Sequence, residues 1–256
     1  MSNLLLQVRD LRKAFGGVQA VEGISFDLAP GEMLAMIGPN GAGKSTTFNM
    51  LHGQLRPDAG EVLFQGLSVG GLSSRALWRK GVGRTFQIAE TFTSLSVIEN
   101  VQLALLSHDG GVFQLWRRAA AHRQVDALAL LAQVGLESQA ERPSHELAYG
   151  DVKRLELGIA LASNPALLLM DEPTAGMAPQ ERLDLMALTR RLVAERGMAV
   201  LFTEHSMDVV FAHADRVIVL ARGHLIAAGT PQAIRDDAQV QAVYFGTGHT
   251  FEQVAS

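Results

Sequence analysis

Residues 33–52 of the chain read MLAMIGPNGAGKSTTFNMLH, and this stretch decides the fold. Its first five residues, Met33–Ile37, form a continuous apolar run, which is typical of a strand buried on both faces of a parallel sheet. Residues 38–46, GPNGAGKST, match the pattern G-x4-G-K-[ST], and a helix is predicted from there to about His52. This order of strand, glycine-rich loop and helix predicts a phosphate-binding loop, because backbone N–H groups and the helix N-terminus face phosphate oxygens.

Two side chains of this loop have a predicted chemical role. Lys44 reaches the β- and γ-phosphates of a bound nucleotide, and the Ser45 hydroxyl is a ligand of Mg²⁺. The chain has only four lysines, so a chance match to the pattern is rare. An ordinary glycine-rich turn is the weaker interpretation.

The composition of the 256 residues excludes several classes of protein. There is no cysteine, which excludes disulfide frameworks, thiolate metal sites and cysteine nucleophiles. The net charge of −4 gives no global basic field for nucleic-acid binding. Uncharged stretches such as 157–170 are shorter than the roughly 20 apolar residues of a membrane span, and the N-terminus lacks the pattern of a signal peptide. We expect a cytosolic, globular chain that does not cross a membrane alone.

Strand and helix signals alternate through most of the chain. Pro179 and Gly197 bound the clearest helix, because proline suits a first helical turn and glycine suits the position after the last one. This alternation predicts a parallel α/β sheet. Besides 33–37, the predicted strands are residues 4–11, 18–28, 61–65, 82–86, 166–170, 199–202 and 216–220.

The chain is therefore expected to be one domain, residues 1–256, with two lobes. Residues 1–86 and 163–230 form a catalytic core lobe that includes an N-terminal β region. Residues 87–162 are rich in Ala, Leu and Gln and form an inserted helical subdomain. Thr230 and Pro231 are an N-cap and first-turn pair, which opens a C-terminal helical tail over residues 231–256.

Two acids end the apolar run at 167–172, LLLMDE. In a phosphate-loop fold an acid at this strand end holds Mg²⁺, which fits Asp171, and Glu172 is placed to accept a proton from an attacking water. His205 follows the next predicted strand and is expected to contact the γ-phosphate. The plainer interpretation is that these residues only end strands or lie on the surface.

In their order and spacing, these residues resemble the ATP-binding cassette (ABC) ATPases over essentially the whole chain. The features that carry the resemblance are Phe15, 38–46, Gln87, 147–151 (LAYGD), 167–172 and His205. More narrowly, the chain is similar to cassettes of the hydrophobic (branched-chain) amino-acid uptake type, on the evidence of 84–87 (RTFQ), 97–101 (VIENV), the LAYG signature and 174–177 (TAGM). The resemblance implies an α/β fold with a RecA-like parallel-sheet core, an antiparallel β region and an inserted helical subdomain.

The resemblance also implies how ATP is bound. Two cassettes pair head to tail, and each of two ATP molecules lies between the phosphate loop of one subunit and the signature of the other. Phe15 stacks on adenine. The phosphate loop binds through Gly38, Pro39, Asn40, Gly41, Ala42, Gly43, Lys44, Ser45 and Thr46. The signature residues that face the partner's ATP are Leu147, Ala148, Tyr149, Gly150 and Asp151.

The implied catalytic and metal-binding residues overlap. The catalytic residues are Glu172, His205, Gln87 and Lys44, and the metal ligands are Ser45, Gln87 and Asp171. Gln87 has its role from the resemblance alone. The expected cofactors are ATP and Mg²⁺.

The implied partners place the chain in a transporter. The helical subdomain, with residues 88–101, docks on membrane permease subunits, so the cassette lies peripherally on the cytoplasmic face of the inner membrane. A solute-binding protein is an indirect partner, and no nucleic acid is expected. The function is then that of the ATP-hydrolysing subunit of an importer of branched-chain or hydrophobic amino acids or a related small solute.

Two positions depart from the family pattern, and other functions stay open. Ala148 replaces the usual signature serine, which removes a hydroxyl donor to the γ-phosphate, and Ala178 stands where the family carries an aspartate. One alternative is a cassette of the lipopolysaccharide-export type, which also has a tyrosine in its signature. The other is a soluble ABC ATPase that acts on DNA or ribosomes. The transported substrate is not fixed by the sequence.

Overall fold

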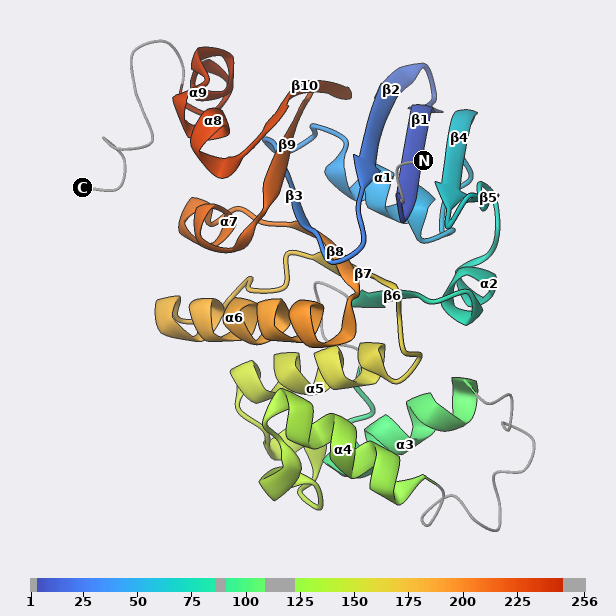
Figure 1. Ribbon diagram of the computed structural model, residues 1–256, viewed down its shortest axis with the longest axis vertical. Coiled ribbons are helices and arrows are strands. Elements are labelled where there is room, and N and C mark those ends of the chain that lie inside the picture. Colours follow the sequence, from blue (N-terminus) through green and yellow to red (C-terminus); the bar gives the residue numbers. More distant parts are fainter. Residues whose placement is uncertain (1–3, 86–90, 109–122, 246–256) are drawn as a thin grey trace.

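A six-stranded sheet forms the centre of the computed structural model, which describes residues 4–85, 91–108 and 123–245 (Figure 1). Neighbouring strands are parallel except for β10 with β9. The predicted parallel α/β sheet is therefore confirmed. In spatial order the strands are β10 (His224–Gly229), β9 (Arg216–Ala221), β3 (Met33–Ile37), β8 (Ala199–Thr203), β7 (Leu167–Asp171) and β6 (Val82–Thr85).

The central strands are buried on both faces of this sheet. In β3, Met33, Ala35 and Ile37 belong to one apolar cluster, whereas Leu34 and Met36 belong to the other. Successive side chains of a strand point to opposite faces, so a strand with both faces covered must be apolar at every position. This is why β3 and its neighbour β8 are continuously buried.

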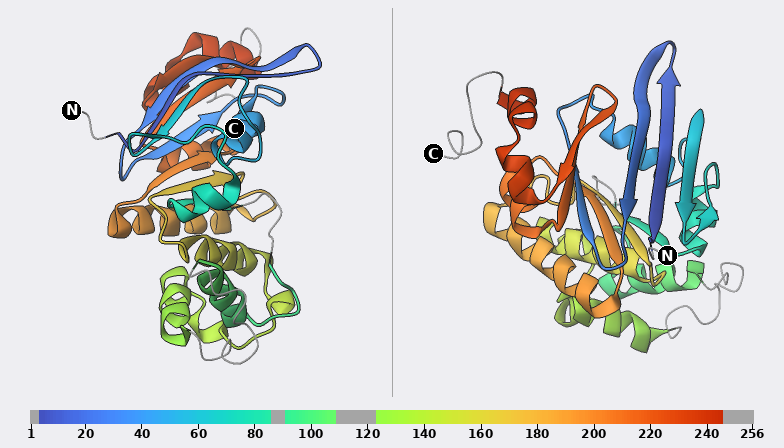
Figure 2. Two further views of the ribbon diagram at one scale, coloured as in Figure 1. Left: turned by 90° about the vertical axis from the view of Figure 1, so that its right-hand side faces the viewer. Right: turned by 45° about the horizontal axis from the view of Figure 1, so that its top comes forward.

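A second, antiparallel sheet lies at the end of the molecule opposite the helices α3 and α4 (Figures 1 and 2). Every pairing within it is antiparallel. This confirms the expected antiparallel β region. Its strands, in spatial order, are β2 (Val18–Leu28), β1 (Leu6–Phe15), β4 (Ala59–Phe64) and β5 (Leu67–Ser68).

The helices fall into two groups. Three of them pack on one another and come from the stretch predicted to be helical, namely α3 (Val97–His108), α4 (Gln124–Val134) and α5 (Tyr149–Leu161). We call these the helical group. The others are α1 (Lys44–Leu51), α2 (Ser74–Arg79), α6 (Pro179–Arg196), α7 (Met207–His213), α8 (Pro231–Asp236) and α9 (Ala238–Phe245). The residue bounds of the two predicted lobes remain a prediction.

The structure differs from the sequence prediction in several short elements. The first strand spans Leu6–Phe15 rather than 4–11, because its far half pairs with β2 although it is mostly polar. Four elements, α2, α7, β5 and β10, are not predicted from the sequence. Helices of six or seven residues are too short to show a helical period. β10 lies at the edge of the sheet and is only half-buried, and its apolar run, residues 225–228, is just four residues long and includes two alanines, which have a low strand propensity.

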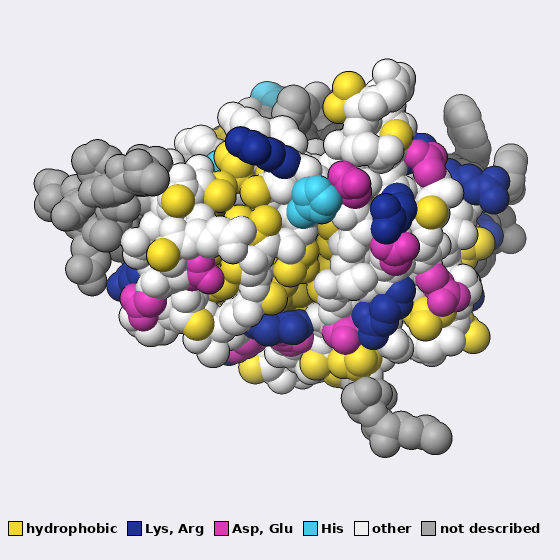
Figure 3. Space-filling model, turned by 90° about the horizontal axis from the view of Figure 1, so that it is seen from above, with side chains coloured by type: hydrophobic (Ala, Val, Ile, Leu, Met, Phe, Trp, Pro, Cys, Tyr) yellow, Lys and Arg dark blue, Asp and Glu magenta, His cyan; other side chains and the backbone are white. Residues whose placement is uncertain are grey.

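The surface carries charges of both signs. On the face shown in Figure 3, Lys and Arg side chains lie among Asp and Glu, with hydrophobic side chains between them. This agrees with a chain of 22 basic and 26 acidic residues. Among the described residues, no helix is long and apolar enough to cross a membrane.

We predict that Phe202→Ala, in the centre of β8, lowers the free energy of unfolding by about 3–5 kcal/mol. Phe202 is fully buried, and removing its ring loses apolar burial and leaves a cavity. Chemical denaturation measures this. The control is Leu67→Ala, where the side chain is 60% exposed, and a change below about 0.5 kcal/mol is expected. Equal effects of the two variants would contradict the assignment of this core.

Candidate functional site

The predicted phosphate loop and acids meet at one edge of the six-stranded sheet. Because β3, β8, β7 and β6 are parallel, the segments that follow their carboxyl ends lie along the same edge. The loop 38–43 follows β3, Glu172 follows β7, and His205 follows β8. The topology therefore brings together residues that are far apart in the sequence.

The phosphate loop joins β3 directly to α1, as predicted. Gly38 and Gly43 have φ angles of +154° and +101°. A Cβ atom at Gly38 would lie 2.2 Å from the backbone oxygen of Leu220, and one at Gly43 would lie 2.5 Å from that of Ala20. Glycine is therefore required at both positions, both by the backbone conformation and by the close approach of another chain segment.

Lys44 is the first residue of α1, and its side chain folds back over the loop. The Nζ atom donates hydrogen bonds to the carbonyl oxygens of Gly38 and Pro39, at 2.6 and 3.2 Å. Burial lowers the pKa of the Lys44 ammonium, whereas the charges of Glu172 and Asp171 act in the opposite direction. The ammonium is thus held within the field of both carboxylates.

A chain of polar contacts joins the two acids to His205. Thr203 Oγ1 donates to Asp171 Oδ1 at 2.8 Å and accepts from the backbone N–H of Glu172 at 3.0 Å. Glu172 Oε1 lies 2.8 Å from His205 Nε2. Glu172 has a φ of +48°, so the chain leaves the extended conformation directly after Asp171. The two neighbouring carboxylates therefore have different partners, Thr203 for one and His205 for the other.

Glu204 is a buried residue that the sequence analysis missed. Its Oε1 accepts hydrogen bonds from the backbone N–H and the hydroxyl of Thr174, at 3.0 and 2.6 Å. Its Oε2 accepts from the backbone N–H of His205 at 3.2 Å. Glu204 therefore ties the segment after Glu172 to the segment that carries His205. The feature of the sequence that could have indicated this role is an acidic residue directly after the apolar strand β8.

Arg84 is a second residue whose role was missed, since the sequence analysis used it only as a mark of family type. It lies on β6, and its Nη2 is 3.2 Å from Asp171 Oδ2. Its Nη1 donates to Asn49 Oδ1 and to Gln54 Oε1, both at 2.9 Å. The arginine and aspartate side chains are only 6% and 14% exposed, so this is a largely buried ion pair. The only sign of this role in the sequence is an arginine within a predicted strand, residues 82–86.

Phe15 and the signature tyrosine present aromatic rings at the surface. Phe15 ends β1 and is 46% exposed, with Lys13 Nζ 5.6 Å from its ring centroid. Tyr149 begins α5, is also 46% exposed, and donates its hydroxyl hydrogen bond to the backbone oxygen of Ala175 at 3.1 Å. Large exposed aromatic rings are typical of surfaces that bind a ligand or a partner.

The other predicted residues near the signature have structural contacts of their own. Ala148 is the N-cap of α5 and has no side-chain hydrogen bond there. Leu147 is buried, and Asp151 accepts a hydrogen bond from Gln139 Nε2 at 2.9 Å. Ala178 caps α6, and its N–H donates to a glutamate of that helix. Gln87 lies outside the described residues.

The oxygen donors at the sheet edge fit a magnesium ion. Ser45 is exposed at the start of α1, and Asp171 Oδ1 is oriented by Thr203. No cluster of three or more His, Cys, Asp or Glu that could hold a metal occurs among the described residues. Magnesium commonly takes one or two protein oxygens and completes its shell with phosphate and water, so a hydroxyl and a carboxylate suffice here.

Comparisons with known proteins agree with this geometry. The sequence matches the ABC transporter family over residues 21–175 and the branched-chain amino acid ATP-binding cassette transporter family over 224–250. It is 37% identical over 253 residues to the high-affinity branched-chain amino acid transport ATP-binding protein BraF of Pseudomonas aeruginosa, and equally to LivG of Escherichia coli. Both comparisons cover 96% of this chain and 99% of the relative. The lipopolysaccharide export system ATP-binding protein LptB of Escherichia coli is 34% identical over 241 residues, which cover 94% and 97% of the two chains.

Solved structures are similar over nearly the whole chain. The ADP conformation of an ATP-binding cassette of an ABC transporter has a TM-score of 0.86 at 30% identity, covering 95% of this chain and 99% of that one. A dimeric post-hydrolysis cassette bound to ADP and Pi has a TM-score of 0.75 at 25% identity, covering 88% and 98%. With its phosphate loop, paired acids and sheet order, the chain belongs to the ABC transporter family, as an ATP-hydrolysing cassette of the branched-chain amino-acid type.

Proposed function

We propose that the chain is the ATP-binding and ATP-hydrolysing subunit of an importer. It couples ATP-driven pairing of two cassettes to the uptake of branched-chain or other hydrophobic amino acids, or of a related small solute. The observation that carries the hydrolytic role is the 2.8 Å contact between Glu172 and His205 at the sheet edge that also holds the phosphate loop. The match over 224–250 and the two 37% identical relatives support the transport role.

The chemical step follows from the arrangement of side chains. When ATP binds, Lys44 Nζ leaves the carbonyl oxygens of Gly38 and Pro39 for the β- and γ-phosphates. Asp171 and Ser45 would hold Mg²⁺, which neutralises phosphate charge. Glu172 accepts the proton of the water that attacks the γ-phosphorus, the bond from that phosphorus to the β–γ bridging oxygen breaks, and ADP and inorganic phosphate leave.

His205 serves the same step through two contacts. Its imidazole contacts the Glu172 carboxylate, and with ATP bound it would contact an oxygen of the γ-phosphate. Because Glu204 fixes the backbone of His205, the imidazole and the carboxylate keep their relative positions during the reaction.

A second cassette would complete each site. Phe15 stacks on the adenine of the bound ATP, and the exposed Tyr149 and the half-buried Gly150 face the ATP of the partner. Ala148 has no hydroxyl to offer to that γ-phosphate, so the backbone N–H groups at the start of α5 supply the contact. ATP binds the paired state more tightly than the separate one, and hydrolysis reverses this preference.

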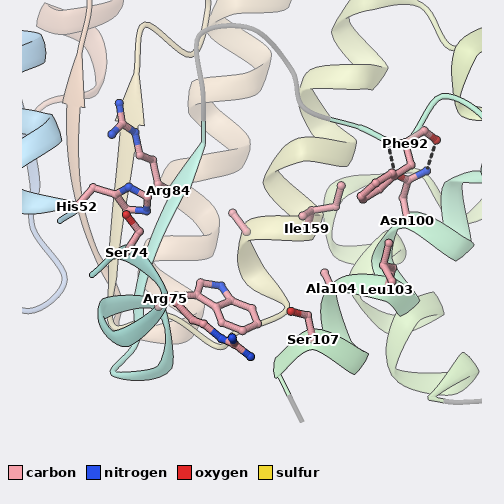
Figure 4. Close-up of a pocket in the computed structure, with 12 residues that line it drawn as sticks. His52, Ser74, Arg75, Arg84, Phe92, Asn100, Leu103, Ala104, Ser107 and Ile159 are labelled. Carbon is pink, nitrogen blue, oxygen red and sulfur yellow. Dashed lines mark hydrogen bonds between the residues drawn. The ribbon is translucent and has the colours of Figure 1, made fainter. Parts of the chain in front are cut away.

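The permease subunit would dock at a pocket of about 540 Å³ between α2, β6 and the helical group (Figure 4). The pocket combines the apolar side chains of Trp78, Phe92, Leu103 and Ile159 with the cation of Arg75, and none of the described residues that line it is acidic. Phe92 is 58% exposed and lies in the segment 88–101 that was predicted to dock. Such a surface suits an amphipathic cytoplasmic segment with apolar and acidic side chains. The cassette would then lie on the cytoplasmic face of the inner membrane, with a solute-binding protein as an indirect partner.

Export of lipopolysaccharide is the alternative function, because LptB is 34% identical. Import is favoured because two branched-chain amino acid relatives are 37% identical over a longer alignment, and because the C-terminal match is to the branched-chain type.

We predict that Glu172→Gln preserves ATP binding, slows turnover about a hundredfold or more, and accumulates an ATP-bound dimer. The amide keeps the shape of the side chain but cannot accept the proton of the attacking water. A phosphate-release assay and size-exclusion chromatography with ATP measure the two effects. The matched control is Glu195→Gln, an exposed acid on α6, which should behave as the wild type. Near-normal turnover of Glu172→Gln would exclude Glu172 as the base.

We predict that Lys44→Ala weakens nucleotide binding about tenfold to a hundredfold, because a charge-assisted hydrogen bond to phosphate is lost. Isothermal titration calorimetry with ADP and with a non-hydrolysable ATP analogue measures this. Lys80→Ala is the control, since Lys80 is exposed directly after α2. Unchanged binding by Lys44→Ala would remove the loop 38–46 from the site.

For the transport role, we predict that leucine, isoleucine or valine stimulates the ATPase activity of the chain when it is assembled with the permeases that copurify with it. The measurement uses proteoliposomes that contain the permeases, the cassettes and the solute-binding protein. Glu172→Gln in the same vesicles should abolish uptake while leaving solute binding intact. Stimulation by lipopolysaccharide instead, with no response to amino acids, would favour the alternative function.

A further inference from the structure

Arg84 makes contacts that the proposed chemistry does not use. Its guanidinium lies 3.2 Å from Asp171 Oδ2, on the side of the carboxylate away from the oxygen that Thr203 bonds. The same guanidinium bonds to Asn49 of α1 and to Gln54 just beyond that helix. These three contacts fix the direction of the arginine side chain.

The burial of this ion pair gives it an electrostatic consequence. The Arg84 side chain is 6% exposed and that of Asp171 is 14% exposed. A carboxylate this far from water requires a counter-charge, because burying an unpaired charge is costly. Arg84 supplies that charge at the carboxylate that is proposed to hold Mg²⁺.

The other end of the Arg84 side chain borders the proposed docking pocket. Figure 4 shows Arg84 beside His52, with its guanidinium directed away from Leu103 and the helical group. Burial lowers the pKa of His52 to about 4, and the positive charge of Arg84 acts in the same direction. The Arg84 side chain therefore lines the pocket and also contacts the carboxylate of Asp171.

We propose that Arg84 is a positioning residue for the magnesium site, whose guanidinium orients Asp171 and neutralises part of its charge. This rests on the proposed function in one respect, namely that Asp171 holds Mg²⁺. Magnesium must then share Asp171 with an internal cation, so Arg84 limits how much the ion strengthens nucleotide binding. Without the guanidinium, the same ion would meet an uncompensated carboxylate and gain more from it.

The test measures the contribution of magnesium to nucleotide affinity. A fluorescent, non-hydrolysable ATP analogue is titrated into the full-length protein, first with EDTA and then with MgCl₂. The dissociation constant in EDTA is divided by the dissociation constant in MgCl₂, so a larger ratio means that magnesium strengthens binding more. Both constants come from the same preparation, so a smaller folded fraction cancels in the ratio. No turnover is involved.

We predict that Arg84→Met raises this ratio about fivefold or more above that of the wild type. Arg84→Lys loses contacts that the guanidinium makes, but it keeps a positive charge near Asp171, so the ratio should stay within about twofold of the wild type. Arg79→Met is the matched control, because Arg79 is an exposed arginine of α2 outside the pocket lining, and its ratio should not change. Arg84→Met should also lower the melting temperature, because Asn49 and Gln54 lose a donor.

Two results would overturn the proposal. One is a ratio for Arg84→Met that stays within about twofold of the wild type, which would make the ion pair purely structural. The other is an equal rise in Arg84→Lys and Arg84→Met, which would make the charge irrelevant. A wild-type protein that binds the analogue equally well with and without magnesium would instead contradict the magnesium site of the proposed function.

Discussion

Asp171 is held from two sides, by the hydroxyl of Thr203 and by the guanidinium of Arg84, and the geometry of the site depends on this. The three residues come from adjacent parallel strands. Asp171 is directly opposite Thr203 across β7 and β8, and Arg84 is opposite Leu169 across β6 and β7. The strand register thus fixes the carboxylate, and the chain turns at the next residue to send Glu172 to His205 instead.

Two elements connect this edge to the pocket between the sheet and the helical group. Helix α1 starts at Lys44 in the phosphate loop and ends next to His52, which lines the pocket. Strand β6 contains Arg84, whose side chain lines the pocket and also forms an ion pair with Asp171. Both are short elements whose side chains are mostly buried, so we expect them to shift as units within the close-packed interior. Helix α1, with its C-cap His52, and strand β6 therefore each contribute residues both to the proposed nucleotide site and to the proposed docking surface.

Much of this arrangement could be predicted from the sequence, because its strongest signals are local. The loop 38–46 matches a known pattern. β3 is a continuous apolar run, and α6 has a proline at its start and a glycine after its end. Glu204 and Arg84 could not be assigned roles in this way. Their roles come from contacts with Thr174 and Asp171, which depend on which strands lie side by side. Short helices such as α2 show too few residues for a period.

The central claim is that the carboxyl edge of β3, β7 and β8 forms one magnesium–ATP site. The most direct measurement is anomalous diffraction from crystals of the protein grown with Mn²⁺ and a non-hydrolysable ATP analogue. We predict a single Mn²⁺ peak between the phosphates, Ser45 and Asp171, with Lys44 Nζ moved from the Gly38 carbonyl oxygen to the phosphates. A nucleotide bound with Mn²⁺ elsewhere, or Lys44 still bonded to Gly38, would contradict the account.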